Sequence, residues 1–217
     1  RNFSDVPQFS LASEDNRPVY VSPASIVPST GAIDAGSNRA SSDFSQVSEA
    51  VSDLRSYTQE LQFGISPRTF NSIFNWSLTY VYRDTKQLSR GFGDNTAGDP
   101  LALFWGNTGP QHQVNFNTSI TLGGAVNLTT FIRVSSGNRF TPSVAGDING
   151  DGSSNDRAFI FNPATASDSG LRSGMQSLLG SLSGSTRQCL TAQLGQIAGR
   201  NSCSGPWAVQ MSALNLQ

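Results

Sequence analysis

The sequence predicts an all-β protein built from antiparallel strands, and three observations support this prediction. Apolar and polar side chains alternate over about ten residues at a time, tight turns separate these segments, and charged residues are few. Of 217 residues, 36% are hydrophobic and 13% are charged, and the net charge is −1. Globular chains usually carry about a quarter charged residues, so this chain is poor in charge. The near-neutral balance gives no electrostatic support for a nucleic-acid partner.

The alternation is clearest in residues 112–136. Along 112–122 the even positions are mainly apolar and the odd ones are mainly Asn, Ser and Thr, and the same pattern returns along 126–136. A period of two indicates strands with two different faces. Leu122 and Val126 share the apolar face, so the loop between them needs an odd number of residues. The turn 123–125, with two glycines, meets this condition.

Two further strands are expected upstream, over about 46–65 and 70–83, followed by a long loop over 84–111. Pairing Ile65 with Phe70 leaves the four-residue turn 66–69, in which Pro67 suits a type I turn. Strand order then places the two tight turns at one end of the sheet. The long connections, 84–111 and 137–206, lie at the other end, although compact domains rarely contain such long structureless loops.

This arrangement is typical of an antiparallel transmembrane β-barrel segment with short periplasmic turns and long extracellular loops. No apolar stretch is long enough for a transmembrane helix, but membrane strands give only weak alternating signals. On this interpretation, the residues expected to face lipid are Phe74, Trp76, Leu78, Tyr80, Phe116, Ile120, Leu128 and Ile132. Those expected to line the polar lumen are Asn75, Ser77, Thr79, Asn115, Asn117, Asn127, Thr129 and Arg133.

The remaining segments are expected to lie outside these strands. Residues 1–45, rich in Pro and Ser, are predicted to form an extended extracellular loop, and 207–217 to start a further strand. Four or five strands cannot close a barrel, because closure takes about eight. The chain is therefore expected to be a fragment whose missing strands come from the rest of the polypeptide or from neighbouring copies.

An Asp- and Asn-rich motif over residues 147–156 is the one candidate site with metal chemistry. Oxygen-bearing side chains at its first, third and fifth positions, followed by glycine at the sixth, match the opening of a calcium loop. The candidate Ca²⁺ ligands are Asp147, Asn149, Asp151, Asn155 and Asp156. Position twelve, where a bidentate Glu is expected, is Ala158. The alternative is an Asx-rich turn whose side chains bond their own backbone, and both interpretations stay open.

Cys189 and Cys203 are the only cysteines and are expected to form a disulfide, because no His or further Cys lies nearby to complete a metal site. Two free thiols or soft metal ligands are the alternative. Within the same long loop, apolar residues recur at helical spacing from Leu171 to Leu182 after Asp168. This spacing predicts a short amphipathic helix with Asp168 as its N-cap.

The run from Arg139 to Pro163, RFTPSVAGDINGDGSSNDRAFIFNP, resembles a signature of Oar-like TonB-dependent receptors, which are bacterial outer-membrane barrels. The cysteine pair and the segment Ser204–Trp207, which leads into a strand, also resemble these receptors. The resemblance covers about 44–217, the C-terminal part of such a barrel. It implies import of a large ligand, loops outside the bacterial outer membrane, and partnership with a plug and an inner-membrane TonB-type energy transducer. The plug and the TonB box are absent from this sequence, so energy coupling is implied by the resemblance only.

No catalytic constellation is found, and the chain is not expected to be an enzyme. His112, the sole histidine, has no clear partner, and Glu49 and Asp53 would face away from Glu60 on a strand. The alternative from another class is a calcium-stiffened extracellular adhesive or surface-assembly β protein. The Asp-rich loop and the Pro- and Ser-rich start suit that alternative equally well.

Overall fold

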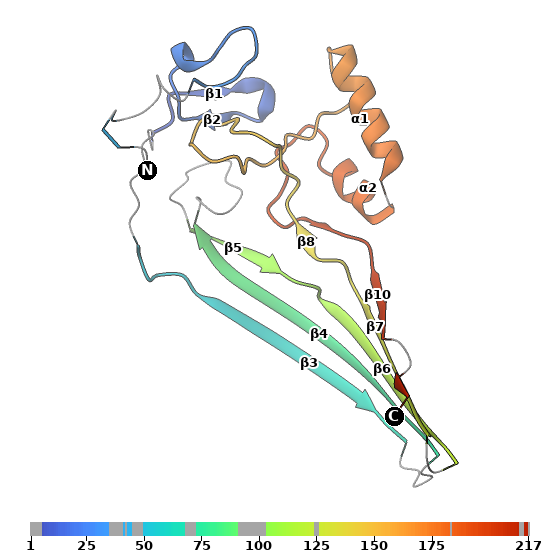
Figure 1. The fold of residues 1–217 in the computed structure, drawn as a ribbon. Coiled ribbons are helices and arrows are strands. Elements are labelled where there is room, and N and C mark those ends of the chain that lie inside the picture. The colour runs from blue at the N-terminus through green and yellow to red at the C-terminus, as the bar shows by residue number, and fades with distance from the viewer. Residues whose placement is uncertain are drawn as a thin grey trace. The chain divides into compact units, whose positions relative to one another are not determined.

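The computed structural model describes residues 6–34, 41, 43–44, 50–67, 73–90, 103–123, 126–182, 184–212 and 215–216. The chain divides into two compact units. The loop unit comprises 1–55, 87–106 and 140–203, and the sheet unit comprises 56–86, 107–139 and 204–217. The structure is rich in antiparallel strands and has few helices, which confirms the β-rich fold expected from the sequence (Figure 1).

The main sheet has the strand order β10-β7-β6-β4-β3, with β5 paired to β4 and β11 paired to β7. Its strands are β3 (Ser56–Ile65), β4 (Phe74–Arg90), β5 (Leu103–Thr108), β6 (His112–Leu122), β7 (Val126–Ser135), β10 (Ala208–Met211) and β11 (Asn215–Leu216). Neighbours β4 and β6, β6 and β7, and β7 and β10 run antiparallel. In the described part of the chain the sheet is open, and β3 and β10 end this order.

The strand register confirms which side chains share a face. Leu78 lies opposite Phe116, which lies opposite Ile132, and Asn75 lies opposite Ser119. Leu122 pairs with Val126, as the parity of the loop requires, and Gly123 has a φ of 58°, in the left-handed region. Residues 124 and 125 of that turn lie outside the described residues.

The predicted register between the first two strands is wrong. Side chains that meet across β3 and β4 are Thr58 with Thr85, at 3.0 Å between hydroxyl oxygens, and Glu60 with Arg83, at 2.6 Å between Oε2 and Nη2. The same register places Ile65 opposite Leu78 instead of Phe70. Residues 68–70, which include half of the predicted turn, lie outside the described residues. A shift by an even number of residues keeps every side chain on its face, and alternation therefore cannot distinguish the two registers.

Several predicted boundaries also change. The strand expected over 46–65 begins at Ser56, with no strand over 50–55, and the one expected over 126–136 ends at Ser135. The strand expected over 70–83 runs to Arg90, and the loop expected over 84–111 contains β5. Residues 84–87 are polar on both faces, so alternation gives no signal there, although β4 continues to pair. The strand expected over 207–217 is present as β10 and β11.

The loop unit contains β1 (Phe9–Leu11), β2 (Arg17–Val19), α1 (Ser169–Ser181) and α2 (Gly184–Thr191), with two 3₁₀ turns at Ala12–Glu14 and Pro23–Ser25. The short strands β8 (Arg139–Phe140) and β9 (Cys203–Ser204) pair with each other. Asp168 caps α1, since its Oδ1 accepts a hydrogen bond from the Leu171 amide at 2.8 Å, as predicted.

The prediction of an extended loop over 1–45 is wrong for its first half. β1 and β2 pair antiparallel, and Val19, Tyr20 and Val21 are at most 2% exposed. A second apolar cluster forms around Ile160, Leu190, Ala198 and Cys203. Strands of three residues are too short to show alternation, and their burial depends on contacts with residues far along the chain. Local sequence pattern could not predict them.

Candidate functional site

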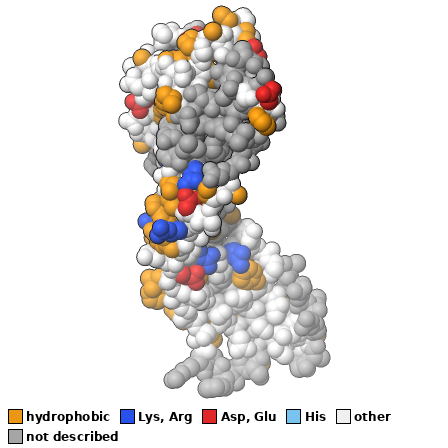
Figure 2. All heavy atoms as spheres, turned by 90° about the vertical axis from the view of Figure 1, so that its left-hand side faces the viewer, with side chains coloured by type: hydrophobic (Ala, Val, Ile, Leu, Met, Phe, Trp, Pro, Cys, Tyr) orange, Lys and Arg blue, Asp and Glu red, His pale blue; other side chains and the backbone are white. Residues whose placement is uncertain are grey.

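The sheet presents one apolar face that no protein layer covers in the described part of the chain. Of the buried hydrophobic residues, Val81 alone belongs to the sheet unit, and it lies on the polar face. On the apolar face Phe63 is 59% exposed, Ile65 63% and Met211 70%. Figure 2 shows hydrophobic side chains at the surface in the middle and lower part of the view, with some Lys, Arg, Asp and Glu side chains beside them. Apolar surface of this extent indicates a binding partner or a membrane.

The predicted lipid-facing residues are brought together on this apolar face. They form three cross-strand rows: Phe74, Ile120 and Leu128; Leu78, Phe116 and Ile132; and Tyr80, Val114 and Val134. Between the first two rows lies Trp76, opposite Thr118 and Thr130. The sequence pattern therefore grouped these side chains correctly. No helix among the described residues is long and apolar enough to cross a membrane.

The polar face brings together the predicted lumen-facing residues, and several of them bond to one another. Asn115 Oδ1 accepts hydrogen bonds from Gln113 Nε2 at 2.9 Å and from Arg133 Nε at 3.3 Å. The Ser119 hydroxyl donates to Asn127 Oδ1 at 3.0 Å. Phe131 is the aromatic exception on this face, and the Arg133 guanidinium carbon lies 5.3 Å from its ring centre.

Aromatic side chains gather where β4 and β6 end their pairing. The Tyr80 hydroxyl lies 2.8 Å from His112 Nδ1, and the His112 ring lies 5.4 Å from Tyr82 and 6.3 Å from Trp207, between ring centres. Trp207 is 59% exposed. His112 therefore has the aromatic partners that the sequence did not reveal. At the other end of the pairing, Phe74 lies opposite Ile120.

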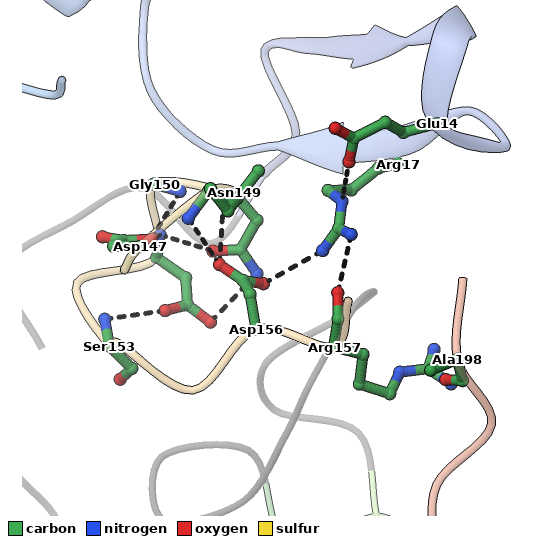
Figure 3. Close-up of polar contacts among 11 residues, drawn as sticks. Glu14, Arg17, Asp147, Asn149, Gly150, Ser153, Asp156, Arg157 and Ala198 are labelled. Atoms are coloured by element: carbon green, nitrogen blue, oxygen red, sulfur yellow. Dashed lines mark hydrogen bonds and ion pairs between the residues drawn. The ribbon is translucent and has the colours of Figure 1, made fainter. Parts of the chain in front are cut away.

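The Asp- and Asn-rich loop folds around its own backbone amides. Asp147 accepts hydrogen bonds from the amides of Gly150 at 2.7 Å, Asp151 at 3.1 Å and Gly152 at 2.9 Å. Asn149 Oδ1 accepts from the Asp151 amide, and Asp151 Oδ1 from the Ser153 amide, each at 2.9 Å (Figure 3). These bonds are those of the Asx-rich turn considered from the sequence.

Gly150 fixes how this loop meets the hairpin of β1 and β2. It has a φ of +72°, and a Cβ atom there would lie 2.2 Å from Val21 Cγ1, so a larger residue has no room. The neighbouring Asn149 carbonyl accepts a hydrogen bond from the Tyr20 amide at 2.7 Å. The loop is thereby joined to residues more than a hundred positions earlier in the chain.

Asp156 lies at the centre of the loop and is 0% exposed. Its Oδ2 accepts hydrogen bonds from the amides of Ile148 at 2.6 Å and Asn149 at 3.0 Å, and its Oδ1 lies 3.5 Å from Arg17 Nη1. Arg17 is itself 1% exposed and reaches Glu14 Oε2 at 2.8 Å and the Arg157 carbonyl at 2.7 Å. Figure 3 shows this chain of contacts from Glu14 through Arg17 to Asp156.

Burial shifts the pKa values of the charged groups in this loop. Desolvation raises the pKa of Asp156 from 3.8 to about 6, against the lowering effect of its two amide donors and of Arg17. Desolvation also raises the pKa of Asp147. It lowers the pKa of Arg157 to about 10, with Arg200 and Arg17 adding to the lowering. The carboxylates of Asp147, Asp151 and Asp156 therefore lie in one partly buried site with the guanidinium groups of Arg17 and Arg157.

We expect the loop to lose stability as the pH rises from about 4 to about 6. Because the folded-state pKa of Asp156 lies above its ordinary value, its contribution is complete below pH 4 and lost as pH rises through about 6. The upper limit of the loss is about 3 kcal/mol, from about 1.4 kcal/mol per pKa unit. Hydrogen exchange at the Ile148 and Asn149 amides, compared between wild type and Asp156→Asn at pH 4 and 7, measures it. Equal pH dependence in both proteins would show that Asp156 is not responsible.

Calcium binding by the loop stays a prediction. Asp147, Asn149, Asp151 and Asp156 come together, and Asn155 lies half-buried in the same loop. Within the described residues there is no group of three His, Cys, Asp or Glu side chains placed to hold a metal ion. Sequence reasoning missed Arg17, which pairs with Asp156, and Glu14, which pairs with Arg17. Their one local signal was a charged residue beside the apolar run Val19–Val21.

The predicted disulfide is confirmed. Cys189 and Cys203 are bonded, with their Cα atoms 5.5 Å apart, and Cys203 is fully buried. Gln193 Nε2 donates to the Cys189 carbonyl at 3.0 Å, and its Oε1 accepts from the Gly199 amide at 2.6 Å. The disulfide and this glutamine together hold α2 against the segment that leads to β9.

Comparison with known proteins gives no assignment, since no family model, curated protein or solved structure matches the chain. The resemblance to TonB-dependent receptors therefore stays a prediction, and function must be argued from the two faces of the sheet and from the loop unit.

Proposed function

We propose that this chain forms part of the wall and outer loops of a TonB-dependent receptor in a bacterial outer membrane. The observation that carries the proposal is a sheet whose apolar face has no protein layer over it in the described part of the chain, while its polar face bonds internally. In a soluble two-layer domain the apolar face would be the buried one. In a barrel wall it meets lipid.

Strand length supports the same proposal. β3 and β7 have 10 residues each and β6 has 11. A transmembrane β-strand needs about 9–11 residues when tilted. The group formed by Tyr80, Tyr82, His112 and Trp207 at one end, with Phe74 toward the other, would provide interfacial aromatic residues at both membrane surfaces.

The open edges of the sheet indicate where further strands would pair with it. β3 and β10 end the described strand order, so we propose that further strands of the same barrel pair with them and enclose a plug. The loop unit would stand outside the membrane and take part in binding a large ligand, since loops on a rigid scaffold usually carry specificity. Energy for import would come from an inner-membrane TonB-type transducer.

Labelling of single cysteines by a membrane-impermeant thiol reagent in intact cells tests this proposal. Because the two native cysteines are in a disulfide, they have no thiol to react and can remain in place. We expect protection at Leu78, Phe116 and Ile120 and labelling at Ser77, Asn115 and Asn117. Labelling of both sets, together with release of the protein by high salt, would contradict the proposal and favour the extracellular adhesive.

A further inference from the structure

A cavity of about 490 Å³ opens on the sheet, and we propose that it binds a neutral carbohydrate. Its volume lies within the range of small-ligand sites, about 300–1,000 Å³. The residues that line it include Asn75, Ser77, Asn117, Ser119, Thr129 and Phe131. The inference rests on the proposed function in one respect, that the polar face of the sheet meets water.

The chemistry of the lining is polar without charge. Two adjacent rows of the polar face supply most of it: Asn75, Ser119 and Thr129, and next to them Ser77, Asn117 and Phe131. No Lys, Arg, Asp, Glu or His lies among the lining residues of the described chain. Amide and hydroxyl groups each offer both donors and acceptors, so the matching ligand carries many neutral hydroxyl groups.

Some polar side chains of this cavity have hydrogen-bonding groups that the described protein does not use. Within the described residues, the side chains of Asn75 and Thr129 make no hydrogen bond, and Asn117 Nδ2 reaches Ser77 Oγ only at 3.4 Å. Asn115 and Asn127, on the same face but outside the cavity, do have side-chain partners. The amide of Asn75 and the hydroxyl of Thr129 are therefore left for a ligand in this cavity.

Phe131 gives the cavity a flat apolar surface. It is the one aromatic residue on the polar face of the described strands β4, β6 and β7, opposite Asn117. The Arg133 guanidinium carbon lies 5.3 Å from its ring centre, and the residue is part of the cavity lining. A pyranose ring has an apolar C–H face and a rim of hydroxyl groups, and aromatic side chains bury the first while amides bond the second.

An anionic ligand is less well matched. Arg133 is the nearest cation on β7, and it is occupied by the Phe131 ring and by Asn115 Oδ1 at 3.3 Å. An apolar ligand would leave the amides of Asn75 and Asn117 without partners, which costs free energy. A neutral oligosaccharide can form hydrogen bonds with the amides and pack its apolar C–H face against the Phe131 ring.

Saturation-transfer NMR on the intact protein tests the inference, in micelles of a detergent without a sugar headgroup. The probes are maltotriose, cellotriose, xylotriose and chitotriose as neutral ligands, and trigalacturonate as an anionic one. We expect at least one neutral trisaccharide to bind, Phe131→Ala to weaken its Kd about tenfold, and Phe131→Tyr to preserve it. Thr79→Ala is the matched control, because Thr79 lies on the same face outside the cavity and should leave binding unchanged.

Two results would overturn the inference: no binding of any neutral trisaccharide at millimolar concentration, or binding that Phe131→Ala leaves intact. Trigalacturonate binding that is lost in Arg133→Gln, without neutral binding, would also overturn it. Cysteine labelling in the Phe131→Ala background distinguishes failure of the cavity inference from failure of the barrel proposal. If labelling still alternates while sugar binding is absent, the cavity inference alone is wrong. If labelling does not alternate but sugar binding depends on Phe131, the cavity inference is supported and the barrel proposal is contradicted.

Discussion

Replacing Arg17 by alanine should destabilise the loop unit by about 3–5 kcal/mol, the usual cost of removing one partner of a buried ion pair. Arg17 is 1% exposed and Asp156 0%, so the carboxylate would stay buried after losing its ion-pair partner. The Arg157 carbonyl and Glu14 would lose their donor as well. Protease cleavage of the loop unit in increasing urea measures the change in the free energy of unfolding.

Arg187→Ala is the matched control for that experiment. Arg187 is exposed, and its guanidinium donates to the carbonyls of Gly180 at 2.9 Å and Leu182 at 3.0 Å. Its loss removes hydrogen bonds without burying a charge, so we expect a cost below about 1.5 kcal/mol. Equal costs for the two substitutions would show that Arg17 and Asp156 do not form a buried pair.

Replacing both Cys189 and Cys203 by alanine should destabilise the loop unit by about 3 kcal/mol. The bond closes a loop with a sequence separation of 14, and its removal restores conformational freedom to the unfolded chain. Cys203 also lies in the apolar cluster with Ile160, Leu190 and Ala198, so loss of its sulfur adds a small packing cost. The same urea and protease experiment measures the effect.

Reduction of the wild-type protein by dithiothreitol separates the two contributions, because it breaks the bond but leaves both sulfur atoms. We expect reduction to give most of the loss seen in the double alanine variant. A reduced protein as resistant to protease as the oxidised one would contradict the role of the disulfide in holding α2.

The faces of the sheet could be predicted from the sequence, but the register of β3 on β4 could not. Alternation assigns each side chain to a face, and both the predicted partner Phe70 and the observed partner Leu78 keep Ile65 on the same one. The register that places Leu78 opposite Ile65 is seen in contacts between particular side chains, such as Glu60 with Arg83. A sequence pattern with a period of two carries no information on shifts by even numbers.

The Asp-rich loop shows a second limit of prediction from the sequence. Its motif could be recognised from spacing alone, and the structure brings the expected side chains together. Its counter-charge could not be predicted, because Arg17 lies 139 positions before Asp156 and in a segment expected to be an extended loop. Pairs of such separation are formed by tertiary packing, which local propensity does not encode.

If the apolar face of the sheet meets hydrocarbon, as we propose, two neighbouring substitutions on β6 should have very different effects. Phe116 and Asn117 are adjacent on β6, and Phe116 lies in the row of Leu78 and Ile132, between the aromatic residues at both ends. An arginine on the lipid face near the bilayer midplane costs about 2–4 kcal/mol, whereas a lumen position tolerates it. The measurement is the free energy of urea unfolding in lipid vesicles for Phe116→Arg and Asn117→Arg. We expect a loss of that size for Phe116→Arg and little change for Asn117→Arg, whereas equal effects of both would show that the apolar face does not meet lipid.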